Sequence, residues 1–114
     1  MIPKEISYLI YEFAGRIAVY NTDFLEKYLD KLKWYWLSTN ENIPVEFFEK
    51  HLDKVDWKAV SYNNNMSVEF FERHLDKIGW IWIAENKNIP AEFFEKHLDK
   101  IDWWRLSRNK NISV

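Results

Sequence analysis

Residues 66–88 read MSVEFFERHLDKIGWIWIAENKN, and residues 89–111 repeat this pattern as IPAEFFEKHLDKIDWWRLSRNKN. The same 23-residue unit stands before them as IPVEFFEKHLDKVDWKAVSYNNN at 43–65 and, more loosely, as YNTDFLEKYLDKLKWYWLSTNEN at 20–42. A fixed period of this length is typical of stacked arrays, in which each unit buries its apolar face against its neighbours. The pattern therefore predicts a single repeat domain over residues 1–114, in which 112–114 open a truncated fifth repeat.

Each copy carries two helix starts. The first is a residue that favours a helix cap or first turn, followed two places later by an acid that meets the positive end of the helix dipole. These start residues are Asn21, Pro44, Ser67 and Pro90. Apolar residues then recur at helical spacing, as at Phe48 and Leu52, and predict a first helix of about ten residues that ends near Lys54.

The second start lies just before a Trp that occurs in every copy. Asp56, Gly79 and Asp102 are good caps at this position, whereas Lys33 in the first copy is not. The helix that follows, 57–62 for example, is short. The sequence thus predicts an all-α fold: a short-repeat α-solenoid with two short helices per repeat and no β-sheet. We expect the repeated ring to be buried between successive repeats; in the clearest copies it is Trp57, Trp80 or Trp103.

Two Asn columns follow the second helix. The first, at Asn40, Asn63, Asn86 and Asn109, is expected to end the helix in the left-handed conformation that Asn tolerates well. The second column is expected to hydrogen-bond the turns of neighbouring repeats; it comprises Asn42, Asn65, Asn88 and Asn111. Residues 1–19 are predicted to form an N-terminal capping helix, because residues 2–6 (IPKEI) echo the start of a repeat.

The sequence contains no pattern that is typical of an enzyme. The chain has no Cys, only two glycines and hence no Gly-rich phosphate loop, and no catalytic triad pattern.

His51, His74 and His97 occupy one position in successive copies, where helix packing would hold them about 8–10 Å apart. A shared Zn²⁺ needs each ligand nitrogen within about 2.1 Å, so these residues are interpreted as packing histidines, and no metal or cofactor is expected. Repeated acids such as Glu49 are expected to pair with basic residues of the same or the next helix.

The chain also lacks the marks of secretion or membrane insertion. Its start, MIPKEISYLIYEF, is a poor signal peptide, and no run approaches the roughly 18 apolar residues of a membrane span. The default expectation is a soluble, intracellular protein. The net charge of −2 gives no overall attraction to nucleic acid or anionic membrane.

Positions that differ between copies indicate where a partner binds. The variable positions are the first, second and fifth after the repeated Trp, and the first and fifth share a face turned away from the Trp/Leu stripe. The resulting candidate partner-binding residues are Tyr35, Trp36, Lys58, Tyr62, Ile81, Trp82, Trp104, Arg105 and Arg108. An exposed aromatic row rimmed by Lys and Arg is typical of a protein-binding patch. The alternative left open is that some of these rings, Trp36 and Trp82 in particular, cover the neighbouring repeat as part of the core.

The unit W-x-x-L-S-x-N-x-N-I-x-x-E-F-x-E-K-x-x-D-K, read from Trp34 through Asn111, resembles short tandem repeats of large DNA viruses that infect amoebae and algae. The resemblance implies an α-solenoid without catalytic residues, and a site of action in an infected cell or a virion. This chain departs from the family in carrying Asn40-Glu41-Asn42, where Asn-Pro-Asn is common. Ile2-Pro3-Lys4-Glu5-Ile6 with Ile10 also resembles the opening of an F-box, which implies a ubiquitin-ligase adaptor.

Three function classes follow. A non-enzymatic protein-interaction scaffold comes first, and a nucleic-acid binder that stacks bases on exposed Trp beside Lys and Arg comes second. The F-box-like adaptor is third. Because a solenoid end without a polar cap tends to associate, we also expect a homodimer. The residues expected in or beside its interface are Trp104, Leu106, Ile112 and Val114.

Overall fold

The computed structural model describes residues 22–112, and over this range it is all-helical. Eight short α-helices and two 3₁₀ helices follow one another, with no strand among the described residues. In chain order they are α2 (Thr22–Lys27), η1 (Leu29–Lys31), α3 (Trp34–Thr39), α4 (Val45–Lys50), α5 (Trp57–Tyr62), α6 (Val68–Arg73), α7 (Trp80–Ile83), α8 (Ala91–Glu95), η2 (Leu98–Lys100) and α9 (Trp103–Leu106). The predicted all-α class is confirmed. The predicted cap at 1–19, the F-box-like segment, Asn21 and Val114 lie outside the described residues.

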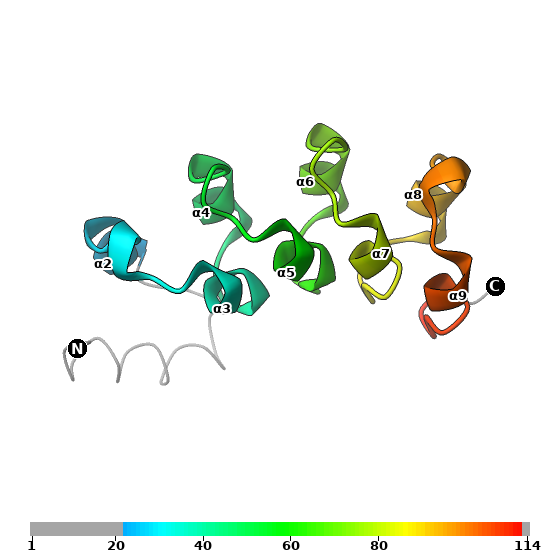
Figure 1. The fold of residues 1–114 in the computed structure, drawn as a ribbon, viewed down its shortest axis with the longest axis horizontal. Helices are drawn as coiled ribbons and strands as arrows, with labels where there is room; N and C mark the ends of the chain where they lie inside the picture. The colour runs from blue at the N-terminus through cyan, green and yellow to red at the C-terminus, as the bar shows by residue number, and fades with distance from the viewer. Residues whose placement is uncertain (1–21, 113–114) are drawn as a thin grey trace.

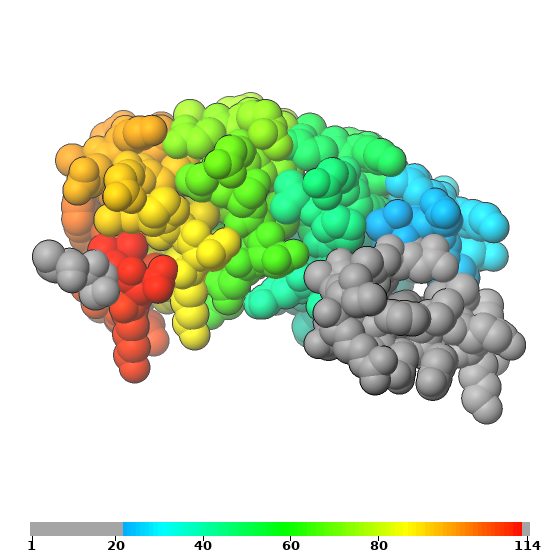
Figure 2. Space-filling model, turned by 180° about the vertical axis from the view of Figure 1, so that it is seen from behind, coloured from blue at the N-terminus to red at the C-terminus, as the bar shows by residue number. Residues whose placement is uncertain are grey.

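The helices form two rows that run side by side along the molecule (Figure 1). Helices α2, α4, α6 and α8 make the first-helix row, and α3, α5, α7 and α9 make the second-helix row. In space-filling view the colours follow one another in bands from blue to red, so each repeat lies beside its neighbours in sequence (Figure 2). The molecule is elongated, with principal extents of 46 × 29 × 20 Å.

Three of the predicted cap residues accept the hydrogen bond expected of a helix cap. Asp56 Oδ1 accepts a hydrogen bond of 3.0 Å from the Ala59 amide, and Asp102 Oδ1 accepts one of 3.0 Å from the Arg105 amide. Ser67 Oγ does the same for the Phe70 amide at the start of α6. Each bond satisfies one of the amides that an α-helix leaves unpaired in its first turn.

The first helices are shorter than predicted. Each α-helix is five or six residues long, and it stops well before the Lys at which a ten-residue helix would end. The break falls at one column, where φ lies between −135° and −129° and ψ between 33° and 44°; its members are Tyr28, His51, His74 and His97. In every copy the ring of this residue packs 4.9 Å from the Phe ring four positions earlier. The chain then continues as a turn or a 3₁₀ helix, a conformation that local propensity alone did not indicate.

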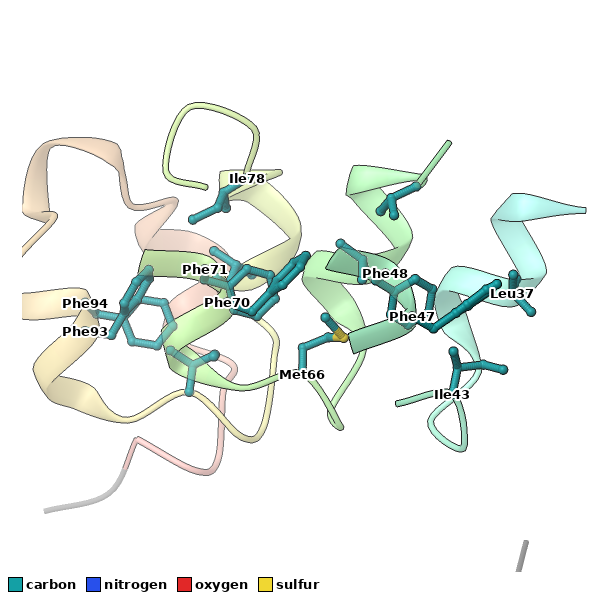
Figure 3. Packing of buried hydrophobic residues seen from close by; sticks show 14 of the residues in the cluster. Leu37, Ile43, Phe47, Phe48, Met66, Phe70, Phe71, Ile78, Phe93 and Phe94 are labelled. Carbon is teal, nitrogen blue, oxygen red and sulfur yellow. The ribbon is translucent and has the colours of Figure 1, made fainter. Parts of the chain in front are cut away.

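The core is a row of Phe pairs between the two helix rows (Figure 3). Phe47 and Phe48, and their equivalents Phe70–Phe71 and Phe93–Phe94, are at most 3% exposed. Ile43, Met66 and Ile89, which close each turn, have no exposed surface. Burying one such side chain stabilises the fold by roughly 1.5–3 kcal/mol, so this row supplies much of the hydrophobic stabilisation.

The repeated Trp packs forward onto the next repeat, as predicted, but with more exposure than predicted. Trp57 stacks on Phe70 at 5.6 Å and Trp80 on Phe93 at 5.9 Å between ring centroids. Both are partly buried. The prediction that Trp103 is a core residue is wrong: it is 56% exposed. The Phe and His that cover the other rings come from the following repeat, and no such repeat follows Trp103 among the described residues.

The two Asn columns act differently from prediction. No described residue other than glycine has a positive φ, so the first column does not end its helices in the left-handed conformation. Instead its amides bridge repeats: Asn86 Nδ2 donates to the carbonyls of Ser61 at 2.9 Å and Asn63 at 3.0 Å. Asn63 and Asn109 make the equivalent pairs of bonds. Hydrogen bonds between repeats were predicted for the second column. Among the described residues of that column, only Asn88 and Asn111 donate such bonds from their side chains.

Candidate binding groove

The residues that vary between copies lie at the surface of the second-helix row. Large apolar side chains are exposed there: Trp36 by 68%, Trp104 by 67%, Tyr35 by 51%, Tyr62 by 49% and Ile81 by 48%. Lys58 and Arg108 are also exposed, whereas Trp82 and Arg105 are partly buried. The alternative that Trp36 covers its neighbour as a core ring is therefore wrong, but for Trp82 it is right in part.

This exposure follows from the short second helix. In α5, Trp57 and Val60 are three residues apart and face the core, and Val60 has no exposed surface. Lys58 and Tyr62 lie on the opposite side and reach solvent. The corresponding residues of the other helices in this row (Figure 1) are also exposed; they are Tyr35 in α3, Ile81 in α7 and Trp104 in α9.

Two hollows open on this face. The first, of about 250 Å³, is lined by Tyr35, Thr39, Lys58, Ala59, Tyr62, Trp82 and Glu85. The second, of about 240 Å³, is lined by Tyr62, Glu85, Lys87, Arg108, Asn109 and Lys110. Because the two hollows share Tyr62 and Glu85, they are parts of one depression, the second-helix groove. Five of the predicted partner-binding residues line it: Tyr35, Lys58, Tyr62, Trp82 and Arg108.

The remaining predicted residues do not line either hollow. Trp104 and Arg105 lie next to the groove, since Arg105 packs over Trp82 at 5.0 Å and Arg108 over Trp104 at 5.0 Å. Sequence reasoning missed Glu85 as a groove residue. Glu85 stands in the same variable column as Tyr62 and Arg108, and this column was the signal that pointed to it.

Glu85 sits at the junction of the two hollows and is held by two arginines. Its Oε1 lies 3.4 Å from Arg105 Nη1 and 3.8 Å from Arg108 Nη1. Arg105 is further oriented by Asp102, whose Oδ2 lies 3.8 Å from Nε. Two guanidinium groups thus offset the carboxylate charge in the middle of the groove.

Charge is divided unevenly between the two rows. The segments that carry the first helices (22–32, 43–55, 66–78 and 89–101) hold twelve acidic and eight basic residues. The segments that carry the second helices (33–42, 56–65, 79–88 and 102–111) hold four acidic and six basic residues, and two of those acids are the helix caps Asp56 and Asp102. The overall net charge of −2 therefore conceals a basic groove face.

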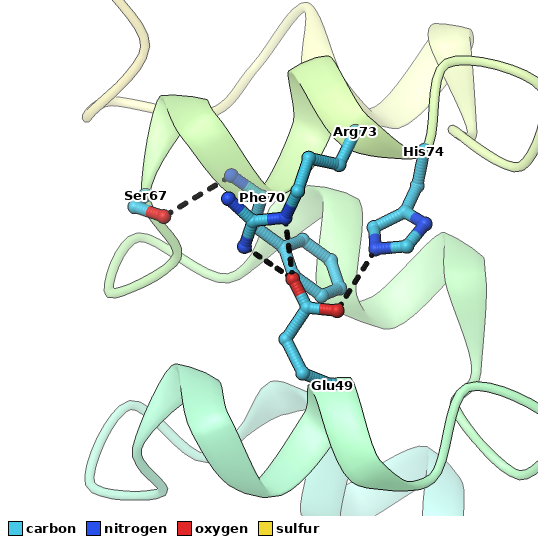
Figure 4. A network of polar contacts seen from close by, with 5 residues as sticks. All are labelled: Glu49, Ser67, Phe70, Arg73 and His74. Carbon is cyan, nitrogen blue, oxygen red and sulfur yellow. Dashed lines mark hydrogen bonds and ion pairs between the residues drawn. The ribbon is translucent and has the colours of Figure 1, made fainter.

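The first-helix row presents a ladder of acids paired to the next repeat. Glu49 Oε2 lies 3.0 Å from His74 Nε2, and its other oxygen accepts from Arg73 (Figure 4). Burial alone would raise the pKa of Glu49, but hydrogen bonds from Arg73 and His74 and their nearby charge outweigh it and hold the pKa below its ordinary value of 4.5. Glu26–His51 repeats this contact at 2.9 Å, and Glu72–His97 at 3.9 Å.

Each acid of this ladder contacts one histidine of the next repeat. Within residues 22–112, no three His, Asp or Glu side chains gather closely enough to hold a metal ion. Each imidazole instead lies between a carboxylate of the preceding repeat and the rings of the core. The predicted pairing of Glu49 with a basic residue of the next helix is confirmed, while His74 is a second partner that was not predicted.

The residues predicted for self-association are spread over the end of the described array. Trp104 is exposed, while Leu106 and Ile112 are partly buried against the core. Val114 lies outside the described residues.

Comparison with family models, with curated proteins and with solved structures found no match to this chain. Among the described residues, none of the helices combines the length and the apolar character that crossing a membrane requires.

Proposed function

We propose that this chain is a short-repeat α-solenoid that acts as a non-enzymatic protein-interaction scaffold and holds its partner in the second-helix groove. The observation that carries this proposal is the row of exposed rings beside that groove. Tyr and Trp supply large contact areas at low entropic cost, and interfaces are enriched in them. Asn side chains donate hydrogen bonds to backbone carbonyls of the preceding repeat, and this preorganisation reduces the ordering cost of binding.

A photo-crosslinking amino acid at Tyr62 tests this proposal. The chain carrying the probe at this position is irradiated in host lysate, and the matched control carries it at Glu46, an exposed residue of the first-helix row. We expect discrete crosslinked proteins from the Tyr62 probe that are absent from the Glu46 probe and are suppressed by unlabelled wild-type chain. Equal patterns from both probes would reject the groove as the interaction site.

A nucleic-acid binder is the second candidate, and the contacts of Trp104 favour it. Arg105 and Arg108 flank this exposed ring at 6.0 and 5.0 Å, an arrangement suited to stacking a base beside a phosphate. Binding of labelled single-stranded DNA at two salt concentrations tests it, since phosphate-driven affinity must fall as salt rises.

Self-association is a further part of the proposal. Trp103 exposes the ring surface that Trp57 and Trp80 place against the next repeat, and Trp104 lies exposed beside it. We propose that a second copy of the chain covers this surface in an isologous dimer, because such a contact closes without forming filaments.

A further inference from the structure

We propose that the second-helix groove takes a linear acidic peptide, in which one large apolar side chain enters the first hollow and carboxylates about three residues away meet the second hollow. This inference rests on the proposed scaffold function and specifies the chemistry of its partner.

The first hollow exists because one residue is small. Ala59 stands where the other copies carry Trp36, Trp82 and Arg105. The missing side chain leaves a space of about 250 Å³ between the rings of neighbouring repeats. Typical small-molecule sites measure roughly 300–1,000 Å³, so this space suits a single large side chain better than a cofactor.

The second hollow offers cationic groups with little internal competition. Among the described residues no carboxylate lies within ion-pair distance of Lys87 or Lys110, and both side chains are exposed. Glu85 is engaged by Arg105 and Arg108, so its charge is offset within the protein. An acidic ligand at this hollow therefore meets two ammonium groups that pair with no carboxylate of residues 22–112.

The spacing of the hollows sets the spacing of the ligand. The lining of the first hollow runs from Tyr35 to Glu85, and the lining of the second runs from Tyr62 to Lys110. The second hollow is therefore displaced from the first by about one repeat. Packed helices lie about 8–10 Å apart, and an extended chain advances about 3.3 Å per residue. About three residues therefore separate the apolar anchor from the acids.

A peptide fits these features better than single-stranded nucleic acid. A nucleic-acid channel needs a continuous basic track along the backbone. Here the first hollow has Lys58 as its only basic lining residue, whereas Lys87, Arg108 and Lys110 all line the second. A polyanion would find few cations at the first hollow, whereas a peptide needs negative charge at one end only.

Selection of phage-displayed random peptides on the full chain tests the inference. We expect enriched sequences to combine an aromatic or large aliphatic residue with acids about three positions away. Binding of a selected peptide, measured by fluorescence anisotropy, should weaken about tenfold in Lys87→Glu/Lys110→Glu. The matched control Lys50→Glu/Lys77→Glu carries the same charge change on the exposed first-helix row and should bind as the wild type does.

Ala59→Trp provides the second arm. The ring fills the first hollow, and Trp36 and Trp82 show that this helix position accommodates Trp, so the variant should retain its melting temperature and lose the peptide.

Enriched peptides without acids that are still blocked by Ala59→Trp would overturn the charge assignment and leave the scaffold function intact. Failure to enrich any peptide, or binding insensitive to both variants, would overturn the inference, and the Tyr62 crosslink then decides the scaffold function separately. Single-stranded DNA binding that is lost in Lys87→Glu/Lys110→Glu, without peptide enrichment, would overturn it in favour of nucleic acid.

Discussion

Asn86 donates a hydrogen bond of 3.0 Å from its side-chain amide to the carbonyl of Asn63, the residue at the same position one repeat earlier. Asn86 is fully buried and makes a second such bond to Ser61. Its Oδ1 meanwhile accepts from the Asn88 amide at 2.8 Å. One side chain therefore both shapes its own turn and ties it to the preceding repeat.

Replacing Asn86 with Ala should destabilise the fold by about 2–4 kcal/mol. The variant leaves two buried carbonyls without this donor and removes the bond that closes the turn. Urea denaturation followed by Trp fluorescence measures the loss. Asn65→Ala is the control, because this side chain is exposed, and it should stay within about 0.5 kcal/mol of wild type. Equal losses in both variants would contradict the assigned roles of the two columns.

Trp80 and Trp103 occupy the same repeat position but should respond differently to truncation. Trp80→Ala removes a ring stacked on Phe93 and should cost about 3 kcal/mol. Trp103→Ala removes a ring that is 56% exposed and should cost less than about 1 kcal/mol at protein concentrations where the chain is monomeric. A loss below about 1 kcal/mol for Trp80→Ala would show that the stack does not stabilise the array.

Ser61 should stabilise the contact between its own helix, α5, and the start of α7, the second helix of the next repeat. Its Oγ donates to the Trp57 carbonyl at 2.6 Å and accepts from the Gly79 amide at 2.9 Å. Ser61→Ala should therefore cost about 1 kcal/mol, without steric strain, because Ala84 occupies the same position in the next copy. The reverse change, Ala84→Ser, should stabilise the chain by supplying an acceptor near the Asp102 amide, and paired denaturation curves compare the two. No loss of stability in Ser61→Ala would mean that solvent replaces the two hydrogen bonds of Ser61 at no cost in free energy.

The lowered pKa of Glu49 should make part of the stability depend on pH. Because the folded-state pKa lies below 4.5, the unfolded chain binds more protons in this window, and stability rises with pH. The contribution of Glu49 should be complete above about pH 4.5 and lost as pH falls through the lowered folded-state pKa. The difference in unfolding free energy between wild type and Glu49→Gln should shrink accordingly as pH falls through this window. A difference that stays constant across this window would refute the ion-pair origin.

Self-association should be visible by light scattering at micromolar concentration. We expect a mass near twice the 14.0 kDa of one chain, reduced to one chain by Trp104→Glu, which places a charge beside the exposed Trp103. Lys58→Glu, on the same helix row but two repeats away, is the control and should leave the mass unchanged. A wild-type mass near one chain, unaffected by Trp104→Glu, excludes the dimer.

The sequence by itself determined the all-helical class and most helix starts. These depend on interactions within a few residues: Asp56 caps the helix that begins beside it, and the Phe pairs follow helical spacing. The face on which Tyr35 and Tyr62 lie could be predicted for the same reason, since it follows from the period of one short helix.

Only the tertiary structure decided the features that depend on residues about one repeat apart. The break at His74 places its ring between Trp57 and Glu49 of the preceding repeat, and Asn86 reaches carbonyls 23 and 25 residues earlier. The hollow at Ala59 is bounded by rings from three repeats, and Trp103 is exposed because its cover has to come from another repeat. Local propensities carry no information about these contacts, because their energies arise only when neighbouring repeats pack together.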